Sequence, residues 1–449
     1  MKKTISLMIL LVLLVLGTGL VQAQDDYEPL PGVKSPDEVD FEGETVYLHG
    51  DHFNTILNED EDVETWGVFN ETFRERVEEA EELFNVKIEG REKIGGEHIQ
   101  DRVLAGDSTH DIYSGQHRNH PEGVNLLPLA NDNMLYRVGE FLSEEYYESL
   151  HNTDEQFAKR MRLRGEYYSF GTHFGPHNPA AMFVQYNKDL LEKEDQPDPY
   201  ELYQDDEWDY KAMEEIMKAV TKDTDGDGEY DQVGMWDNLN EGALRVLNFN
   251  QVEITRRNEE GEFVFDLNSE RGINALNILE EWRNEDELMT NSTEAEDPEV
   301  AFSPNNAIIW WPGTDADHDF GIVPYPKGPD AEEYITPVYA FWVTAIPANA
   351  EDPEGLVALH EFLLRPDDER FDEEMDEYME TRIQTEEHWD MYMKAAEDFG
   401  GEGDPFQWTG LWDIVLEPMN EVLYGEVGAS SRMNEIEPEA QSFIEDFFN

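Results

Sequence analysis

The sequence predicts an α/β protein built as two lobes, and two observations support this. Apolar segments of strand length alternate with segments whose apolar residues recur at helical spacing, which is the pattern of α/β sheets. The chain has 449 residues, which is too long for one hydrophobic core, because single cores stop growing at roughly 250–300 residues. In sheets of this class, ligands bind in loops at the carboxyl ends of the strands.

The first half of the chain begins this alternation. A strand is predicted over 45–49 (TVYLH), followed by a helix in which apolar residues from Phe69 to Phe84 recur at helical spacing. A short strand at 86–88, a helix that ends at Gly106 and a strand at 111–114 (DIYS) come next. This order is that of an α/β sheet.

The second half repeats the pattern less regularly. The segment 338–346 is apolar and aromatic. Strands are predicted at 181–186 (AMFVQY), 232–236 and 307–311 (AIIWW), with a further extended piece at 321–324 (GIVP). Helices are predicted at 213–220, 273–282, 356–363 and 411–423, with a further helical segment to Phe448.

The amino terminus has the features of a secretory signal. Two lysines precede an apolar run from Ile5 to Leu16, and small residues lead to Ala23, so cleavage is expected after residue 23. A membrane anchor is the alternative, but the run is short for a span and polar sequence follows at once. The chain has no cysteine, which excludes disulfides and a lipid-anchoring cysteine. We therefore expect export across the cytoplasmic membrane to a periplasmic or extracellular location, without a lipid anchor.

The charge of the chain is strongly one-sided. It has 104 acidic and 31 basic side chains and a formal net charge of −73. Such a charge is self-repulsive, whereas at molar salt the screening length falls to roughly 3 Å. The acidic residues are spread along the chain and aromatic residues make up 12% of it, so disorder is not expected. These features predict an acidic, halophilic protein and exclude nucleic acid and anionic membranes as partners.

No catalytic motif stands out in the sequence. It has no Gly-x-Ser-x-Gly elbow, no His-Glu-x-x-His and no Gly-rich phosphate loop. With 104 carboxylates, a pair at glycosidase spacing would arise by chance and carries no weight. We therefore expect a protein that is not an enzyme, with a secreted glycosidase as a minor alternative.

Several segments resemble one family of binding proteins. Residues 186–191 (YNKDLL), directly after an apolar strand, resemble a segment of the extracellular solute-binding proteins of sugar ABC importers, the family 1, maltose-binding-protein-like group. The resemblance runs from about Val46 to the carboxyl terminus. Four further matches follow the family's order: 104–106 (LAG) with Asp111-Ile112, 301–302 with 307–308, 323–328 (VPYPKG), and 345–347 (AIP) with the helix after it.

This resemblance implies a fold and a mode of action. It implies the two-lobed periplasmic-binding-protein fold (type II), with the ligand cleft between the lobes. The first lobe would comprise 24–160 plus 325–375, and the second lobe 161–324 plus 376–449. It implies a monomer that binds a mono- or oligosaccharide, closes about a hinge and delivers the sugar to the permease subunits of an ABC importer. Alternatives are another solute (a peptide, a metal chelate or an acidic sugar) or a surface protein without a closing cleft.

The resemblance also selects candidate ligand-binding residues. Asp51 and His52 follow the first strand, although the acidic insertion 58–66 comes soon afterwards, and Gln116 and His117 follow the DIYS strand. Aromatic residues are the other candidates, because rings stack on sugars; for each of them, packing in the core is the alternative. The aromatic candidates are Trp310 and Trp311 at the end of AIIWW, Tyr339 and Trp342 in YAFW, and Trp408 and Trp412 in PFQWTGLW.

Two groups of basic residues allow other functions. Histidines cluster in two stretches and could bind zinc together with a carboxylate, but their irregular spacing favours cleft lining or surface. They are His110, His117, His120, His173 and His177. The dense basic run of Lys159, Arg160, Arg162 and Arg164 is interpreted as a solvated helix face paired with carboxylates. If it faced the cleft, it would select an acidic sugar.

The segment 221–236 (TKDTDGDGEYDQVGMW) resembles a calcium loop. Asp223, Asp225, Asp227 and Asp231 occupy positions one, three, five and nine, but Gly234 stands at position twelve, where such a loop needs a bidentate glutamate. A tight turn before a strand explains the same residues, because Asp side chains bond their own backbone. No cofactor is expected other than, as an option, this structural calcium.

Overall fold

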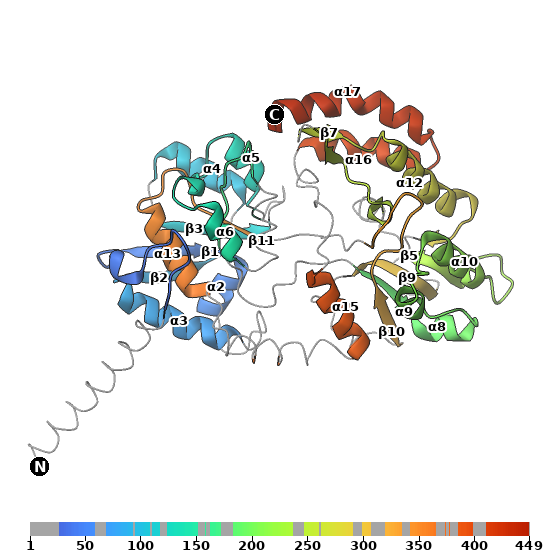
Figure 1. Ribbon diagram of the computed structural model, residues 1–449, viewed down its shortest axis with the longest axis horizontal. Helices are drawn as coiled ribbons and strands as arrows, with labels where there is room; N and C mark the ends of the chain where they lie inside the picture. Colours follow the sequence, from blue (N-terminus) through green and yellow to red (C-terminus); the bar gives the residue numbers. More distant parts are fainter. Residues whose placement is uncertain are drawn as a thin grey trace, which may run out of the picture.

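The computed structural model describes residues 27–58, 69–92, 95–107, 110–116, 124–150, 158, 162–171, 183–236, 247–259, 262–290, 299–306, 319–334, 342–364, 373, 377, 385–397 and 410–448. Figure 1 shows these residues as two groups of helices and strands side by side, here called the first lobe and the second lobe. Within these ranges, every helix is too short or too polar to cross a bilayer.

The first lobe is built on a four-stranded sheet with the order β11-β3-β1-β2. Strands β1 (Thr45–His49), β2 (Lys87–Arg91) and β3 (Asp111–Gln116) run parallel. Strand β11 (Trp342–Ala345) pairs with β3 in the antiparallel direction. Because the three parallel strands carry fully buried apolar residues, the sheet is covered on its faces, as parallel sheets generally are.

Helices cover this sheet. Helix α2 packs on β2, and α3 packs against α13, which comes from the carboxyl-terminal half of the chain. The first-lobe helices are α2 (Asp51–Asn58), α3 (Phe69–Leu83), α4 (Gly96–Ala105), α5 (Leu126–Asn131), α6 (Glu144–Ser149) and α13 (Pro353–Leu364), with 3₁₀ turns η1 (Pro36–Glu38) and η2 (Val138–Glu140).

The second lobe contains a five-stranded mixed sheet with the order β10-β4-β9-β5-β8. Strand β5 is parallel to β9 and to β8, whereas β4 is antiparallel to its neighbours β9 and β10. A separate hairpin is formed by β6 (Thr255–Arg257) and β7 (Phe263–Phe265). The sheet strands are β4 (Phe183–Asn187), β5 (Gln232–Trp236), β8 (Met289–Thr290), β9 (Glu299–Asn306) and β10 (Phe320–Val323).

The second-lobe helices include two that pair near the carboxyl terminus, α16 and α17. Helix α10 packs on β5, while α9 and α15 both pack on β10. The helices are α8 (Lys188–Lys193), α9 (Pro199–Gln204), α10 (Tyr210–Val220), α12 (Glu270–Glu280), α15 (Glu386–Glu397), α16 (Gly410–Leu423) and α17 (Ala429–Phe448), with a π-helical turn η4 (Glu281–Glu285) and the 3₁₀ turn η3 (Asn248–Asn250).

The chain returns to the first lobe through β11. Residues 162–171 pack on the first lobe, where Phe170 bridges to Thr344 of β11, and Lys327 and Gly328 bond the second lobe at Trp208 and Phe249. The sequence predicts lobe boundaries at about 160, 325 and 375. Residues 172–182 and 335–341 lie outside the described residues, so the positions of the exchanges remain predictions.

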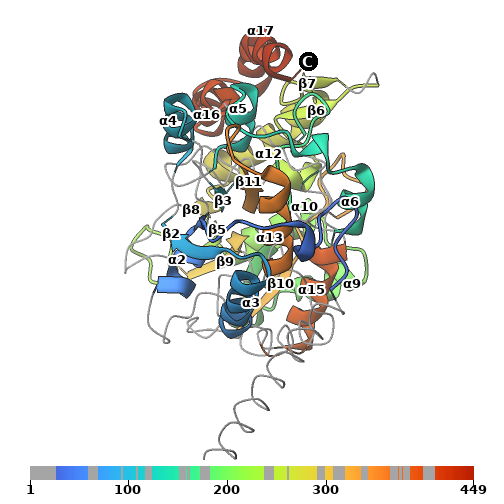
Figure 2. The same cartoon turned by 90° about the vertical axis from the view of Figure 1, so that its left-hand side faces the viewer.

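Within the described residues, a tight turn of the first lobe is hydrogen-bonded to the end of α17 in the second lobe. Arg164 and Gly165 form the tip of a tight turn, with positive φ at both residues (51° and 80°) and paired backbone bonds between Leu163 and Glu166. The Arg164 guanidinium donates to the carbonyls of Asp446 (3.2 Å) and Phe447 (3.0 Å). These are the last carbonyls of α17, and a cation is favourable there. Figures 1 and 2 both place α17 at the same end of the molecule as α5.

Most predicted elements are confirmed where the structure describes them. The strands at 45–49, 111–114, 232–236 and 321–324 and the helices beginning at Phe69, Met213 and Leu411 are present. The strand predicted at 307–311 and residues 181–182 lie outside the described residues. Elements that the sequence did not predict include β8, the β6–β7 hairpin and α15.

A buried polar network holds the first lobe together at Gly171. The Tyr146 hydroxyl donates to the buried Glu361 carboxylate and accepts from the Gly171 backbone N–H at 2.8 Å. Burial raises the pKa of Tyr146 well above 10, so the phenol stays protonated. Gly171 has φ +96°, and a Cβ there would lie 2.4 Å from His360 Cε1. The positive φ and the lack of space for a Cβ atom both require glycine at this position.

Replacing Tyr146 with Phe should lower the free energy of unfolding by about 2–3 kcal/mol, because a buried carboxylate loses a charge-assisted hydrogen bond. Tyr147→Phe is the matched control, since its buried hydroxyl donates to a neutral carbonyl, that of Ser169, at 3.1 Å. This control should lose only about 1 kcal/mol. Chemical denaturation in molar salt measures both values, and equal losses would contradict the role assigned to Glu361.

Candidate functional site

The carboxyl ends of the first-lobe strands meet at one edge of the sheet. Asp51 and His52 begin α2 directly after β1, and Gln116 is the last residue of β3. Gln116 is paired in register with Trp342, the first residue of β11. The backbone therefore places four predicted ligand residues at this edge, whereas their side chains are outside the described part of the structure.

A charged cluster fixes the strands beneath this edge. His49 Nε2 lies 2.6 Å from Asp111 Oδ1, and Arg102 of α4 donates to the same oxygen at 3.2 Å. The His49 ring stacks on Tyr113 with centroids 4.5 Å apart. Both His49 and Asp111 are buried, and a buried carboxylate needs such partners. The cluster joins α4, the end of β1, which leads to Asp51, and the start of β3, the strand that ends at Gln116.

The second lobe offers a comparable edge. Strands β5 and β9 are parallel, so their carboxyl ends, at Trp236 and Asn306, point the same way. Trp236 is half-buried, and Trp310 and Trp311 follow β9 a few residues later. The predicted residues His117, Trp310, Trp311, Tyr339 and Trp408 lie outside the described residues. Trp412 lies in the first turn of α16 and is half-buried against the core.

The acidic turn before β5 brings together three of its four predicted calcium ligands. Carboxylate oxygens of Asp223, Asp225 and Asp227 lie within 4.8 Å of one another, and all three residues are exposed. Each also accepts a backbone N–H of the turn. Asp231 is used differently, because its Oδ2 accepts from the backbone and hydroxyl of Thr224. These bonds lower the pKa of Asp231. The turn is therefore held by its own Asp side chains.

The basic run does not form the predicted helix face over its described part. Arg162 pairs with Glu144 at 3.1 Å, which agrees with the expected carboxylate partner, but Arg164 sits in the tight turn described above. Tertiary contacts of that turn explain the difference. Of the predicted histidine cluster, only His110 is described; its Nδ1 lies 3.3 Å from Glu44, with Glu351 nearby.

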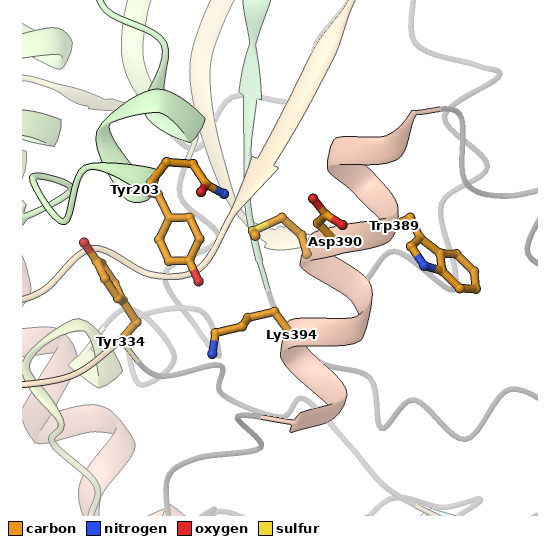
Figure 3. A pocket seen from close by; sticks show the side chains of 7 residues that line it. Tyr203, Tyr334, Trp389, Asp390 and Lys394 are labelled. Carbon is orange, nitrogen blue, oxygen red and sulfur yellow. The ribbon is translucent and has the colours of Figure 1, made fainter.

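A cavity of about 430 Å³ lies on the second lobe between α9, α15 and the segment after β10. Figure 3 shows Tyr203 and Tyr334 on one side of it and Asp390 and Lys394 of α15 on the other. The two tyrosine rings meet edge to face, with centroids 4.9 Å apart. The lining residues are Tyr203, Gln204, Tyr334, Trp389, Asp390, Met391 and Lys394.

The first turn of α15 is anchored to the sheet by several bonds. Glu387 accepts from the Tyr186 hydroxyl at 3.0 Å and from the Lys188 ammonium at 2.5 Å. The Tyr186 hydroxyl also bonds Asp198, the N-cap of α9, at 2.6 Å. His388 lies 3.2 Å from the Phe320 carbonyl and stacks on the Phe320 ring. Both walls of the cavity are thus tied to β4 and β10.

The residues of this cavity were not predicted from sequence. Tyr203, Tyr334 and Asp390 are far apart in the chain, and no family motif contains them. The only sequence signal is the local aromatic content of 200–203 (YELY) and 388–392 (HWDMY), which core packing explains equally well.

Comparisons with known proteins bear on the fold. No protein-family model and no curated protein sequence matches the chain. Solved structures do match. A cyclic α-maltosyl-1,6-maltose binding protein from Arthrobacter globiformis has a TM-score of 0.62 at 14% identity, covering 90% of this chain and 99% of that one.

Two further solved structures match over a similar length. An ABC substrate-binding protein from Listeria monocytogenes, in complex with cycloalternan, has a TM-score of 0.60 at 14% identity and covers 90% of this chain and 99% of its own. A maltose/maltodextrin-binding domain from Bdellovibrio bacteriovorus, bound to maltotriose, has a TM-score of 0.57 at 17% identity and covers 90% and 100%.

These matches define the class of fold. The chain has the two-lobed α/β fold of type II periplasmic binding proteins. The predicted fold class is therefore confirmed, and the resemblance that began with YNKDLL is confirmed at the level of the fold. The structure also explains that motif locally, because Asn187 ends β4 and caps α8 through a bond from the Leu190 N–H at 2.9 Å.

The anchor of α15 predicts a pH dependence. Burial lowers the pKa of His388 below 6.5, with Lys188 lowering it further and Glu387, Asp319 and the Phe320 carbonyl raising it. The unfolded chain therefore takes up the proton first as pH falls. The stability from this group is complete above about pH 6.5 and is lost as pH falls below that value towards the folded-state pKa.

Denaturation midpoints at pH 7.5 and 5.5 should therefore differ less in His388→Gln than in the unmodified protein, since the variant lacks this titration. Carboxylates that titrate elsewhere affect both proteins alike, so the difference between the two reports His388. An unchanged pH dependence in the variant would contradict the assignment.

Proposed function

We propose that this protein binds a carbohydrate between its two lobes, without chemical conversion, and presents it to an ABC importer. The observation that carries the proposal is the fold. The three structures described above cover about 90% of this chain and belong to proteins described as sugar- or substrate-binding. Each of these descriptions names a sugar of the protein concerned. That this chain also binds a sugar is part of the proposal.

The geometry suits such a role. The first-lobe edge carries Asp51, His52, Gln116 and Trp342 by backbone position, and the second-lobe edge leads to Trp310 and Trp311. Closure of the lobes would place a sugar between polar groups that bond its hydroxyls and rings that cover its apolar faces. Hinge closure also changes the outer surface, which gives permease subunits a state to recognise.

The protein would act outside the cytoplasmic membrane, as a monomer, after removal of residues 1–23. The net charge of −73 supports a saline environment, because dilute buffer would leave the acidic groups unscreened. Binding assays therefore belong in molar salt.

Titration of the purified protein with maltotriose and maltotetraose in molar salt should quench or shift tryptophan fluorescence, because closure buries indole rings. Trp342→Ala should weaken binding roughly five-fold, since loss of a stacked ring is worth on the order of 1 kcal/mol. Tyr424→Ala is the control, because Tyr424 is an exposed aromatic residue on the second lobe. It should leave the affinity unchanged.

Other outcomes of the same assay decide between the alternatives. No response to any sugar in a broad panel would count against the proposal. A response to peptides or metal chelates alone would make it a binder of another solute. Release of the chromophore from a chromogenic glycoside would make it a glycosidase instead.

We also propose that the acidic turn takes up calcium as a structural ion, with Asp223, Asp225 and Asp227 as its carboxylate ligands. Their convergence supports this. Calcium uses six to eight oxygen ligands, so water and carbonyl groups must complete the shell, and the affinity should be weak, in the range of 10⁻⁴–10⁻³ M. The ion would lie in the turn before β5. None of the residues proposed above to bind the sugar lies in that turn.

Millimolar calcium should raise the melting temperature, and magnesium should do so less, because magnesium demands a stricter octahedral shell. Asp225→Asn should remove the effect, while Asp231→Asn, which disturbs the turn without removing one of the three converging carboxylates, should keep a calcium response. Equal shifts with both ions in all three proteins would indicate screening alone.

A further inference from the structure

We propose that the cavity between α9 and α15 is a second carbohydrate site, formed by the second lobe alone, which takes one or two rings of a neutral sugar. The inference rests on the proposed function for its class of ligand. It differs from that function in place, because the cavity is lined by residues of the second lobe only.

Hydrogen bonds fix the positions of α9 and α15, the two helices that line the cavity. The Tyr186 hydroxyl bonds both Asp198 at the start of α9 and Glu387 at the start of α15. Across the cavity, the Tyr200 hydroxyl donates to Asp390 at 3.2 Å. The two helices are therefore bonded to the same strand and to each other, so the cavity is already formed in the structure. A preformed space lowers the entropic cost of binding.

The size and lining of the cavity fit a small sugar. Its volume of about 430 Å³ lies at the lower end of the range of small-molecule sites. Tyr203 and Tyr334 supply aromatic faces, and Met391, which packs with Phe320 and Ile322, supplies an apolar floor. Sugars present apolar C–H faces to such surfaces and keep their hydroxyls for polar groups. Figure 3 shows that the Trp389 indole lies on the far side of α15 from the two tyrosines, so the stacking role falls to Tyr203 and Tyr334.

The polar groups are balanced in charge. Asp390 and Lys394 stand one helical turn apart on α15, and the Gln204 amide adds a neutral donor and acceptor. Beside Tyr334, the Lys327 ammonium lies 4.8 Å from the ring centroid and pairs with Asp206 at 2.5 Å. One carboxylate and one ammonium within the lining favour neither a cation nor an anion. A polyhydroxylated neutral ligand satisfies both groups by hydrogen bonds.

The Met391 methyl group gives a local signal for this site. The protein is labelled with ¹³C-methyl methionine, its Met391 resonance is assigned with Met391→Leu, and maltotetraose is added in molar salt. The Met391 resonance should shift and saturate. In Tyr203→Ala the half-saturation concentration should rise at least five-fold, and in Asp390→Asn it should also rise. Tyr230→Ala, which removes an exposed tyrosine elsewhere on the second lobe, should leave it unchanged.

The variants separate local binding from closure of the lobes. Trp342→Ala, which targets the site between the lobes, should leave the Met391 shift intact. If Trp342→Ala abolishes it, or if Tyr203→Ala does not affect it, the resonance reports closure and the second site is refuted. If tryptophan fluorescence responds to sugar while Met391 does not move, the second site is likewise refuted and the proposed function stands. If neither responds to maltotetraose or to any other sugar of the broad panel, the proposed function fails and the second site fails with it.

Discussion

The excess of acidic side chains is the constraint on which the rest of this structure depends. With 104 carboxylates against 31 basic groups, every charge that is buried must have a direct partner, because the chain has few cations to spare. The buried carboxylates follow this rule. Asp111 is bonded by Arg102 and His49, and Glu361 by the Tyr146 hydroxyl. The bonds of Asp111 connect β1, β3 and α4, and Tyr146 connects Glu361 to the backbone at Gly171, so both buried carboxylates join distant segments of the first lobe.

Local rules account for the elements that the sequence predicted. The helix that was expected to end at Gly106 does so, because Gly106 takes a left-handed C-cap conformation with φ +72°. The YNKDLL motif, which the sequence singled out, contains the start of helix α8, and Asn187 caps that helix. Strands β1 and β3 carry buried apolar residues, among them Val46, Leu48 and Ile112, which short runs such as TVYLH indicate directly. These signals depend on neighbours within a few residues, which is why one sequence suffices to find them.

The unpredicted parts depend on contacts between distant residues. Strand β8 is two residues long and exists only through its pairing with β5. Arg162 and Arg164 looked like part of a helix face, but Arg162 pairs with Glu144, and Arg164 lies in a tight turn that is bonded to the end of α17. At the candidate site, the pairing of Gln116 with Trp342 brings together residues that the family resemblance had selected separately. No family resemblance selected the cavity residues Tyr203, Tyr334 and Asp390, because each residue taken alone is an ordinary surface or core position.

The antiparallel strand β11 has a consequence for the order in which the molecule assembles. Its partner β3 ends at residue 116, and β11 begins at residue 342, so a ribosome makes most of the second lobe before the first sheet can be completed. Until then β3 is an unprotected edge that could pair with another chain, and closing so long a loop is slow. The shared negative charge of nascent copies would keep those edges apart. The negative charge, which destabilises the folded protein through self-repulsion, would then protect the incomplete chain from pairing with other chains.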